Sequence, residues 1–160
     1  MNSVELQGIT DHVSRCLQLA VLLEVSAYPK PGNVHRTSDF AETRYEHFLA
    51  SAVALPPHFR YAAKKGVQVF EGRVALSQIG VGRIIKDAVK DVQIWQRDKN
   101  TLLGSILLLS PMAAAAGLTM AGKSSFSINR FRGSLESIVE STTSRDAVDV
   151  YDAINIAQPG

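Results

Sequence analysis

Apolar residues recur at steps of three and four along most of this chain, and that spacing limits the folds open to it. In the stretch 4–25 the positions are filled by Leu6, Ile9, Val13, Leu17, Ala20 and Leu23. This period places apolar side chains on one face of an α-helix. The only segments that could be read as strands are 67–70 and 125–128, and both are short. The sequence therefore predicts an all-α fold.

The same reading predicts a bundle of about six helices in a single helical domain spanning 1–160. We expect long helices at 4–25, 43–55, 74–95, 100–120, 131–141 and 145–157. A shorter helical piece at 57–65 should end at Gly66, because glycine readily takes the left-handed angles of a helix cap. In the helix at 74–95, we expect Arg83, Lys86 and Asp87 to face water.

Composition excludes several classes of protein. The chain carries 17 Lys and Arg against 15 Asp and Glu and has no polybasic tract, so we expect no nucleic-acid or membrane partner. The apolar run 102–120 contains Pro111 and many small residues, which fits a buried bundle helix better than a bilayer span. Cys16 is the only cysteine, and we expect it to be a small core residue of a cytoplasmic protein.

A dense polar cluster surrounds the turn Pro29-Lys30-Pro31-Gly32, at the end of the first predicted helix. Each proline fixes its φ angle, so Lys30 is presented from a stiff connection. Lys30 and Arg36 are suited to an anionic ligand such as a polyphosphate. Glu24 and Asp39 could hold Mg²⁺, which takes only one or two carboxylates, and His35 could carry a proton. The alternative is a solvated loop in which Asp39 caps the next helix.

A second candidate site opens the apolar helix at 100–120. Asn100, Thr101 and Gly104 lie in its first turn, where unpaired N–H groups favour a phosphate or a carboxylate. The alternative is structural, because Asn and Thr are ordinary helix caps and glycine is an ordinary packing residue.

Three motifs in this order resemble the triphosphoribosyl-dephospho-CoA synthase family. The first comprises Glu24, Pro29-Lys30-Pro31-Gly32, Val34, Asp39-Phe40 and Phe48-Leu49-x-Ser51. The second is Asn100-Thr101-x-x-Gly104. The third runs from Asp146-Ala147 through Tyr151 and Ala153-Ile154 to Pro159-Gly160.

The resemblance implies an all-α transferase that uses ATP and 3′-dephospho-CoA, with Mg²⁺. A ribose hydroxyl of dephospho-CoA displaces adenine from C1′ of ATP and gives triphosphoribosyl-dephospho-CoA. By resemblance, Lys30 and Arg36 would bind phosphates, and Glu24 and Asp39 would hold the metal. Asn100 and Thr101 would hydrogen-bond the ligand beside Gly104. The candidates for the catalytic step are Lys30, Asp39 and His35.

The chain departs from the family pattern in places. The segment 36–40 lacks the histidine of the family's Gly-x-His-x-Asp-Met, and Leu102-Leu103 stand where the family has His-Lys. The family also continues beyond Gly160, so we expect a truncated member of a divergent, archaeal-like branch. The alternative is a non-catalytic helical module for nucleotide binding or assembly. Missing helices would leave 107–120 in need of cover, which predicts a homo-oligomer.

Overall fold

The computed structural model describes residues 2–96, 101–122 and 125–158, and these ranges fold into helices and loops. The α-helices are α1 (Ser3–Ser26), α2 (Tyr45–Ala54), α3 (Pro56–Phe70), α4 (Val81–Gln96), α5 (Leu103–Met120), α6 (Ile128–Glu140) and α7 (Ser144–Ala157). A 3₁₀ helix, η1, spans Leu76–Gln78. The described residues contain no β-strand, and the all-α prediction is confirmed.

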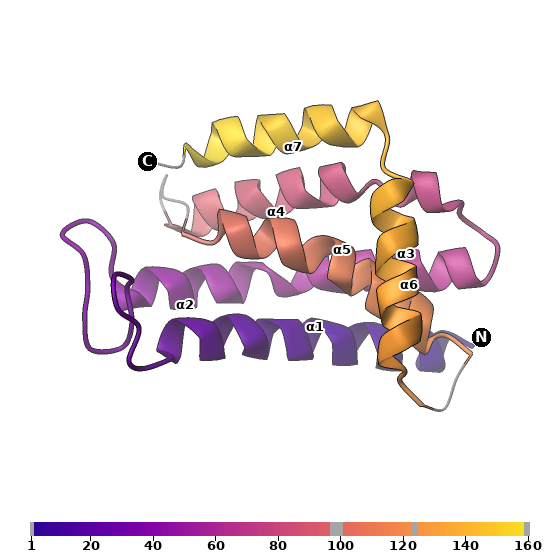
Figure 1. The fold of residues 1–160 in the computed structure, drawn as a ribbon, viewed down its shortest axis with the longest axis horizontal. Helices are drawn as coiled ribbons and strands as arrows, with labels where there is room; N and C mark the ends of the chain where they lie inside the picture. Colours follow the sequence, from indigo (N-terminus) through magenta and orange to yellow (C-terminus); the bar gives the residue numbers. More distant parts are fainter. Residues whose placement is uncertain (1, 97–100, 123–124, 159–160) are drawn as a thin grey trace.

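The helices alternate in direction along the long axis of the molecule (Figure 1). Helices α2 and α3 follow one another in a line, and only Leu55 separates them. Helix α6 crosses the others steeply, at the end of the molecule away from the loop 27–44 (Figure 1). Because of the alternation, the end of α1, the start of α2, the end of α4 and the start of α5 all lie at the loop end. The fold therefore gathers the two candidate sites at one end of the bundle.

Helices α3 and α5 form the closest crossing in the core. A Cβ atom added to Gly66 would collide with the carbonyl oxygen of Ala114, and one added to Gly117 would collide with that of Ala63. The prediction that a helix ends at Gly66 is therefore wrong. Glycine is needed there for backbone approach inside α3, and the chain turns later, at Gly72, where φ is +70°.

Two other expectations about secondary structure are corrected. The strand candidate 67–70 is the last turn of α3, and 125–128 leads into α6. The helix predicted at 74–95 is divided, because η1 is followed by Gly80 with φ of +71° before α4 begins. Only glycine takes such a φ without strain, so the presence of Gly80 in the sequence explains why the helix is interrupted here.

Helix α5 is the one helix among the described residues that is long and apolar enough to cross a membrane, by length and composition alone. A core helix of a bundle passes the same test. Helix α5 packs against α1, α3, α4 and α6, and it buries Ile106, Ser110 and the run 113–115. Packing inside the bundle therefore accounts for part of its apolar composition, since 39% of this stretch is buried.

Candidate functional site

The loop 27–44 carries most of the predicted site residues and is tied to the bundle at both ends. The hydroxyl oxygens of Ser26 and Tyr45 lie 2.8 Å apart and join the end of α1 to the start of α2. Val34, in the middle of the loop, is buried. The polar side chains around Val34 are thus displayed from a loop anchored at three points.

Lys30 and Glu24 form an ion pair at the end of α1. The Nζ of Lys30 lies 2.5 Å from Oε1 of Glu24, and the two side chains are 17% and 53% exposed. The ammonium is therefore largely buried, whereas its carboxylate partner faces solvent on one side. Of the groups predicted to hold phosphate and metal, these two contact each other directly.

His35 and Arg36 gather around the ring of Tyr28. His35 and Ser38 exchange two backbone hydrogen bonds of 3.0 Å, which close a tight turn. The His35 ring meets Tyr28 edge-on at 5.5 Å between centroids, and the Arg36 guanidinium carbon lies 5.7 Å from the Tyr28 centroid. Tyr28 was not among the predicted site residues. An aromatic residue next to a run of prolines was the available signal.

Asp39 caps α2, as the structural alternative predicted. Its Oδ1 accepts a hydrogen bond of 2.8 Å from the backbone N–H of Tyr45, the first residue of the helix. Among the described residues, Oδ2 has no partner. One oxygen thus stabilises the helix start, where a carboxylate is favoured by the helix dipole, and the other is available to a ligand.

Thr101 belongs to a buried polar cluster with Ser51 and Gln96. Its Oγ1 lies 2.9 Å from Oγ of Ser51 and 3.0 Å from Nε2 of Gln96. The Gln96 amide nitrogen also donates to the carbonyl of His47 and to Ser51. Within the described part of the chain, the buried Oε1 of Gln96 has no hydrogen-bond partner. An unpaired buried acceptor is uncommon in folded proteins.

The other residues of the second motif are placed differently. Gly104 is exposed, and a Cβ there would meet no atom within 4 Å, so helix packing does not require glycine at this position. Asn100 lies outside the described residues. Sequence reasoning missed Gln96, although the apolar spacing of α4 points it inward with Val89 and Val92.

A family model for CitG, the ATP:dephospho-CoA triphosphoribosyl transferase, matches residues 10–160. This chain belongs to the CitG family. The family assignment made from the sequence is thereby confirmed. In the same comparisons, no curated protein and no solved structure matches the chain.

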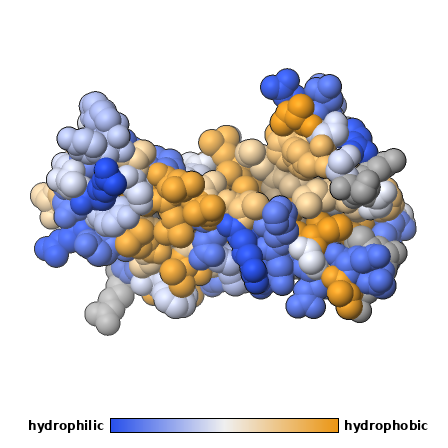
Figure 2. Space-filling view, turned by 90° about the horizontal axis from the view of Figure 1, so that it is seen from below, coloured by the Kyte–Doolittle hydropathy of each residue, from blue (hydrophilic) through white to orange (hydrophobic). Residues whose placement is uncertain are grey.

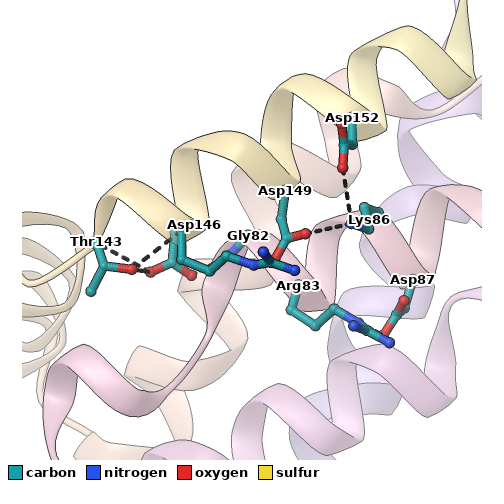
Figure 3. Close-up of polar contacts among 9 residues, drawn as sticks. Gly82, Arg83, Lys86, Asp87, Thr143, Asp146, Asp149 and Asp152 are labelled. Carbon is teal, nitrogen blue, oxygen red and sulfur yellow. Dashed lines mark hydrogen bonds and ion pairs between the residues drawn. The ribbon is translucent and has the colours of Figure 1, made fainter.

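A second polar cluster of this CitG-family chain lies between α4 and α7 (Figure 3). Lys86 reaches from α4 to Asp149 and Asp152, with 3.0 Å between Nζ and Oδ2 of Asp152. Lys86 is only 12% exposed and Asp149 only 4% by side chain, so the prediction that Lys86 faces water is wrong. Arg83 is exposed, as expected, and pairs with Asp87 at 2.7 Å.

Charge pairing shifts the pKa values of this cluster. The hydrogen bond from the Lys86 ammonium holds the pKa of the Asp149 carboxyl below its ordinary value, although burial opposes the shift. The same bond, with that to Asp152, raises the pKa of Lys86. Both groups therefore stay charged at neutral pH.

Asp146, the first residue of the third motif, joins α7 to α4. Its Oδ1 accepts a hydrogen bond of 2.9 Å from the backbone N–H of Gly82 (Figure 3). Its Oδ2 accepts from the backbone and the hydroxyl of Thr143, at 2.9 and 2.8 Å, and so caps α7. All these contacts lie within the protein. In the CitG-family chain this aspartate positions a helix.

No group of three or more His, Cys, Asp and Glu side chains converges on a possible metal position among the described residues. Glu24 and Asp39, the predicted metal ligands, each have one oxygen engaged by a protein group. A Mg²⁺ ion bound mainly through substrate phosphates needs only one or two carboxylates. The donor set at the loop end fits that kind of ion and not a site built from protein ligands alone.

Proposed function

We propose that the loop end of the bundle binds Mg²⁺–ATP and transfers its triphosphoribosyl group to a dephospho-CoA-like acceptor. The observation that carries the proposal is the ion pair of the largely buried Lys30 with the half-exposed Glu24, in a chain matched by the CitG model over residues 10–160. Helices α1, α2, α4 and α5 bring the loop, Thr101 and Gln96 to the same end of the molecule. This grouping supports a single ligand site.

Lys30 is the proposed anchor for the triphosphate. Within the part of the chain that the structure describes, its ammonium has one carboxylate partner, and that partner is half exposed, so a phosphate can replace or join it. Arg36 lies in the same loop and offers a planar fork that suits phosphate oxygens. The stiff Pro29-Lys30-Pro31 connection reduces the conformational entropy lost when the ligand is bound.

The metal would lie between the phosphates and the loop carboxylates. Asp39 offers Oδ2, and Glu24 offers the oxygen that does not contact Lys30. When bound, Mg²⁺ would neutralise phosphate charge and help to orient the triphosphate.

The transfer makes one bond and breaks one. A ribose hydroxyl of the acceptor bonds to C1′, the bond from C1′ to adenine breaks, and the electron pair leaves with adenine. The hydroxyl proton needs a base, for which Asp39 is the candidate, and departing adenine needs a proton, for which His35 is the candidate. Thr101 and Gln96 would contact the nucleotide, with Oε1 of Gln96 accepting a hydrogen bond from an amino group.

A second function, nucleotide binding without turnover, is favoured by one observation. Leu102 stands where the family pattern has histidine, and this residue is 3% exposed and part of the core. The position therefore provides packing and no proton carrier. Binding and turnover must be tested separately.

The test measures ATP binding and adenine release with Lys30→Met and the matched control Lys64→Met, which removes an exposed lysine of α3. We expect wild type and Lys64→Met to release adenine from ATP, Mg²⁺ and dephospho-CoA. Lys30→Met should bind ATP about 10- to 100-fold more weakly, because a charged hydrogen bond is lost. ATP binding without adenine release would establish the second function. Absence of ATP binding by wild type would overturn both.

A further inference from the structure

One side of α1 exposes large apolar residues that the bundle leaves uncovered. Leu19 and Leu23 are 55% and 62% exposed, and Leu108 of the neighbouring α5 is 69% exposed. Ala20 is exposed between the two leucines of α1. Figure 2 views the molecule from this side and shows hydrophobic colour gathered between the hydrophilic lobe at one end and α6 at the other. We call Leu19, Ala20, Leu23 and Leu108 the α1–α5 face.

A hole adjoins this face one to two turns from Leu23 along α1. It has a volume of about 260 Å³ and lies between α1 and α5, among residues that include Cys16, Leu17, Ala116 and Met120. Cys16 is exposed, which corrects the expectation of a core cysteine. The lining is apolar apart from His12, so the hole suits an aliphatic side chain.

We propose that a second copy of this chain covers the α1–α5 face, with the two α1 helices antiparallel across a twofold axis between Leu19 and Ala20. In a twofold interface, positions equally far from the axis meet, and each contact occurs twice. Leu23 of one copy then enters the hole beside Cys16 of the other. Arg15 meets Glu24 in the same arrangement.

The charges along α1 fit this axis. Arg15 is exposed and has no acidic partner among the described residues. Oε1 of Glu24, which contacts Lys30, can accept a second hydrogen bond, so that Oε2 stays available to the proposed metal. The opposite charges of Arg15 and Glu24 favour the antiparallel register. The same axis independently aligns Leu23 with the hole. One symmetry operation therefore satisfies an exposed leucine, an apolar hole and an unpaired arginine.

The chain exposes more surface than a compact monomer of its mass. The chain exposes 8927 Å². A compact monomer of 17.4 kDa is expected to expose about 7,900 Å², which leaves an excess of about 1,000 Å². Each partner in a standard stable interface contributes about 800 Å².

Cysteine cross-linking tests the register. The variant Leu23→Cys places a thiol opposite Cys16 of the second copy, so mild oxidation should give a covalent dimer. Within one chain the two thiols lie about 10 Å apart along the helix, too far for a disulfide. The control is Val148→Cys, whose parent residue is 52% exposed on α7, across the molecule from α1 (Figure 1).

Sedimentation velocity of the unmodified chain provides the second measurement. We expect a dimer at micromolar concentration, and Leu19→Glu should weaken it at least about tenfold because a charge is buried at the axis. Leu19 is exposed in the monomer, so helicity by circular dichroism should be unchanged. A monomeric wild type, a dimer indifferent to Leu19→Glu, or a Leu23→Cys variant that cross-links no more than Val148→Cys would each overturn the proposal.

Discussion

Two lysines of this chain make ion pairs with different consequences. Lys86 forms ion pairs with Asp149, which is buried, and with Asp152. Both pairs join α7 to α4. Among the described residues, Lys30 has one partner, Glu24, which is 53% exposed. An ammonium with a single half-exposed partner can exchange it for a phosphate at little cost. The number and burial of the partners therefore distinguish the structural lysine from the candidate ligand-binding lysine.

The Asp149 carboxylate should make stability depend on pH. Its pKa is lowered in the folded chain, so its contribution is fully present above the ordinary pKa of an aspartate and is lost as the pH falls through the lowered value. We expect Asp149→Asn to lower the melting temperature at neutral pH and to differ less from wild type in acid. Thermal unfolding across that range measures the effect.

The control for this experiment is Asp152→Asn, which alters the half-exposed partner of Lys86. Its effect at neutral pH should be the smaller of the two, since exposed ion pairs contribute little. A difference between Asp149→Asn and wild type that stays constant from neutral to acid pH would contradict the assigned role.

At the scale of elements, the close crossing of α3 and α5 organises the core. Gly66 and Gly117 each face a carbonyl of the other helix, at Ala114 and Ala63. Neither contact leaves room for a methyl group, and the neighbouring atoms belong to the backbone, which cannot rotate away as a side chain can. The helices would have to separate to accept a side chain.

Gly66→Ala should therefore destabilise the chain by about 3 kcal/mol or more, through forced displacement in a packed core. Gly133→Ala is the matched control, because this glycine lies in α6 and a Cβ there meets nothing within 4 Å. The control should gain up to about 1 kcal/mol from higher helix propensity. Urea unfolding of both variants measures the contrast, and equal effects would contradict the packing argument.

At the scale of the whole molecule, helices differ in how firmly they are held. Within α6 only Ile138 is buried, whereas α4 buries residues along its whole length. Local opening is cheapest where few apolar contacts are lost. The molecule should therefore open first at α6, away from the loop end.

Hydrogen exchange under native conditions should reveal this order. Amides of α6 are expected to exchange faster than those in the middle of α3, α4 and α5, because their opening exposes less apolar surface. Mass spectrometry of peptides from each helix provides the measurement. Protection of α6 equal to that of α3 would indicate that the whole chain opens as one unit.

The helical period of the apolar residues predicted the fold, because it indicates which face of each helix is buried. The helices of the bundle pack against one another through these faces. The period could not distinguish a glycine that ends a helix from one that admits a neighbouring backbone, so Gly66 was misassigned. It also placed Lys86 in water, since its partners Asp149 and Asp152 are more than 60 residues away. The family was recognised from motifs whose residue types carry chemistry.

The candidate site was predicted less fully than the fold. Residue types pointed to Lys30, Glu24 and Asp39, yet only coordinates reveal that the first two contact each other and that the third caps α2. Gln96 was missed because a glutamine at the end of an amphipathic helix is common and gives no signal of a functional role. What marks it is the unpaired oxygen, which depends on its surroundings in three dimensions.

The reciprocal glycines of α3 and α5 also bear on how sequences of this kind can diverge or be recombined. Each glycine leaves space that is filled by backbone atoms of the other helix. No substitution can make those backbone atoms smaller. A change at either position cannot be rescued by trimming a side chain elsewhere. In a chimera between two homologues, α3 and α5 should therefore be inherited together from one parent.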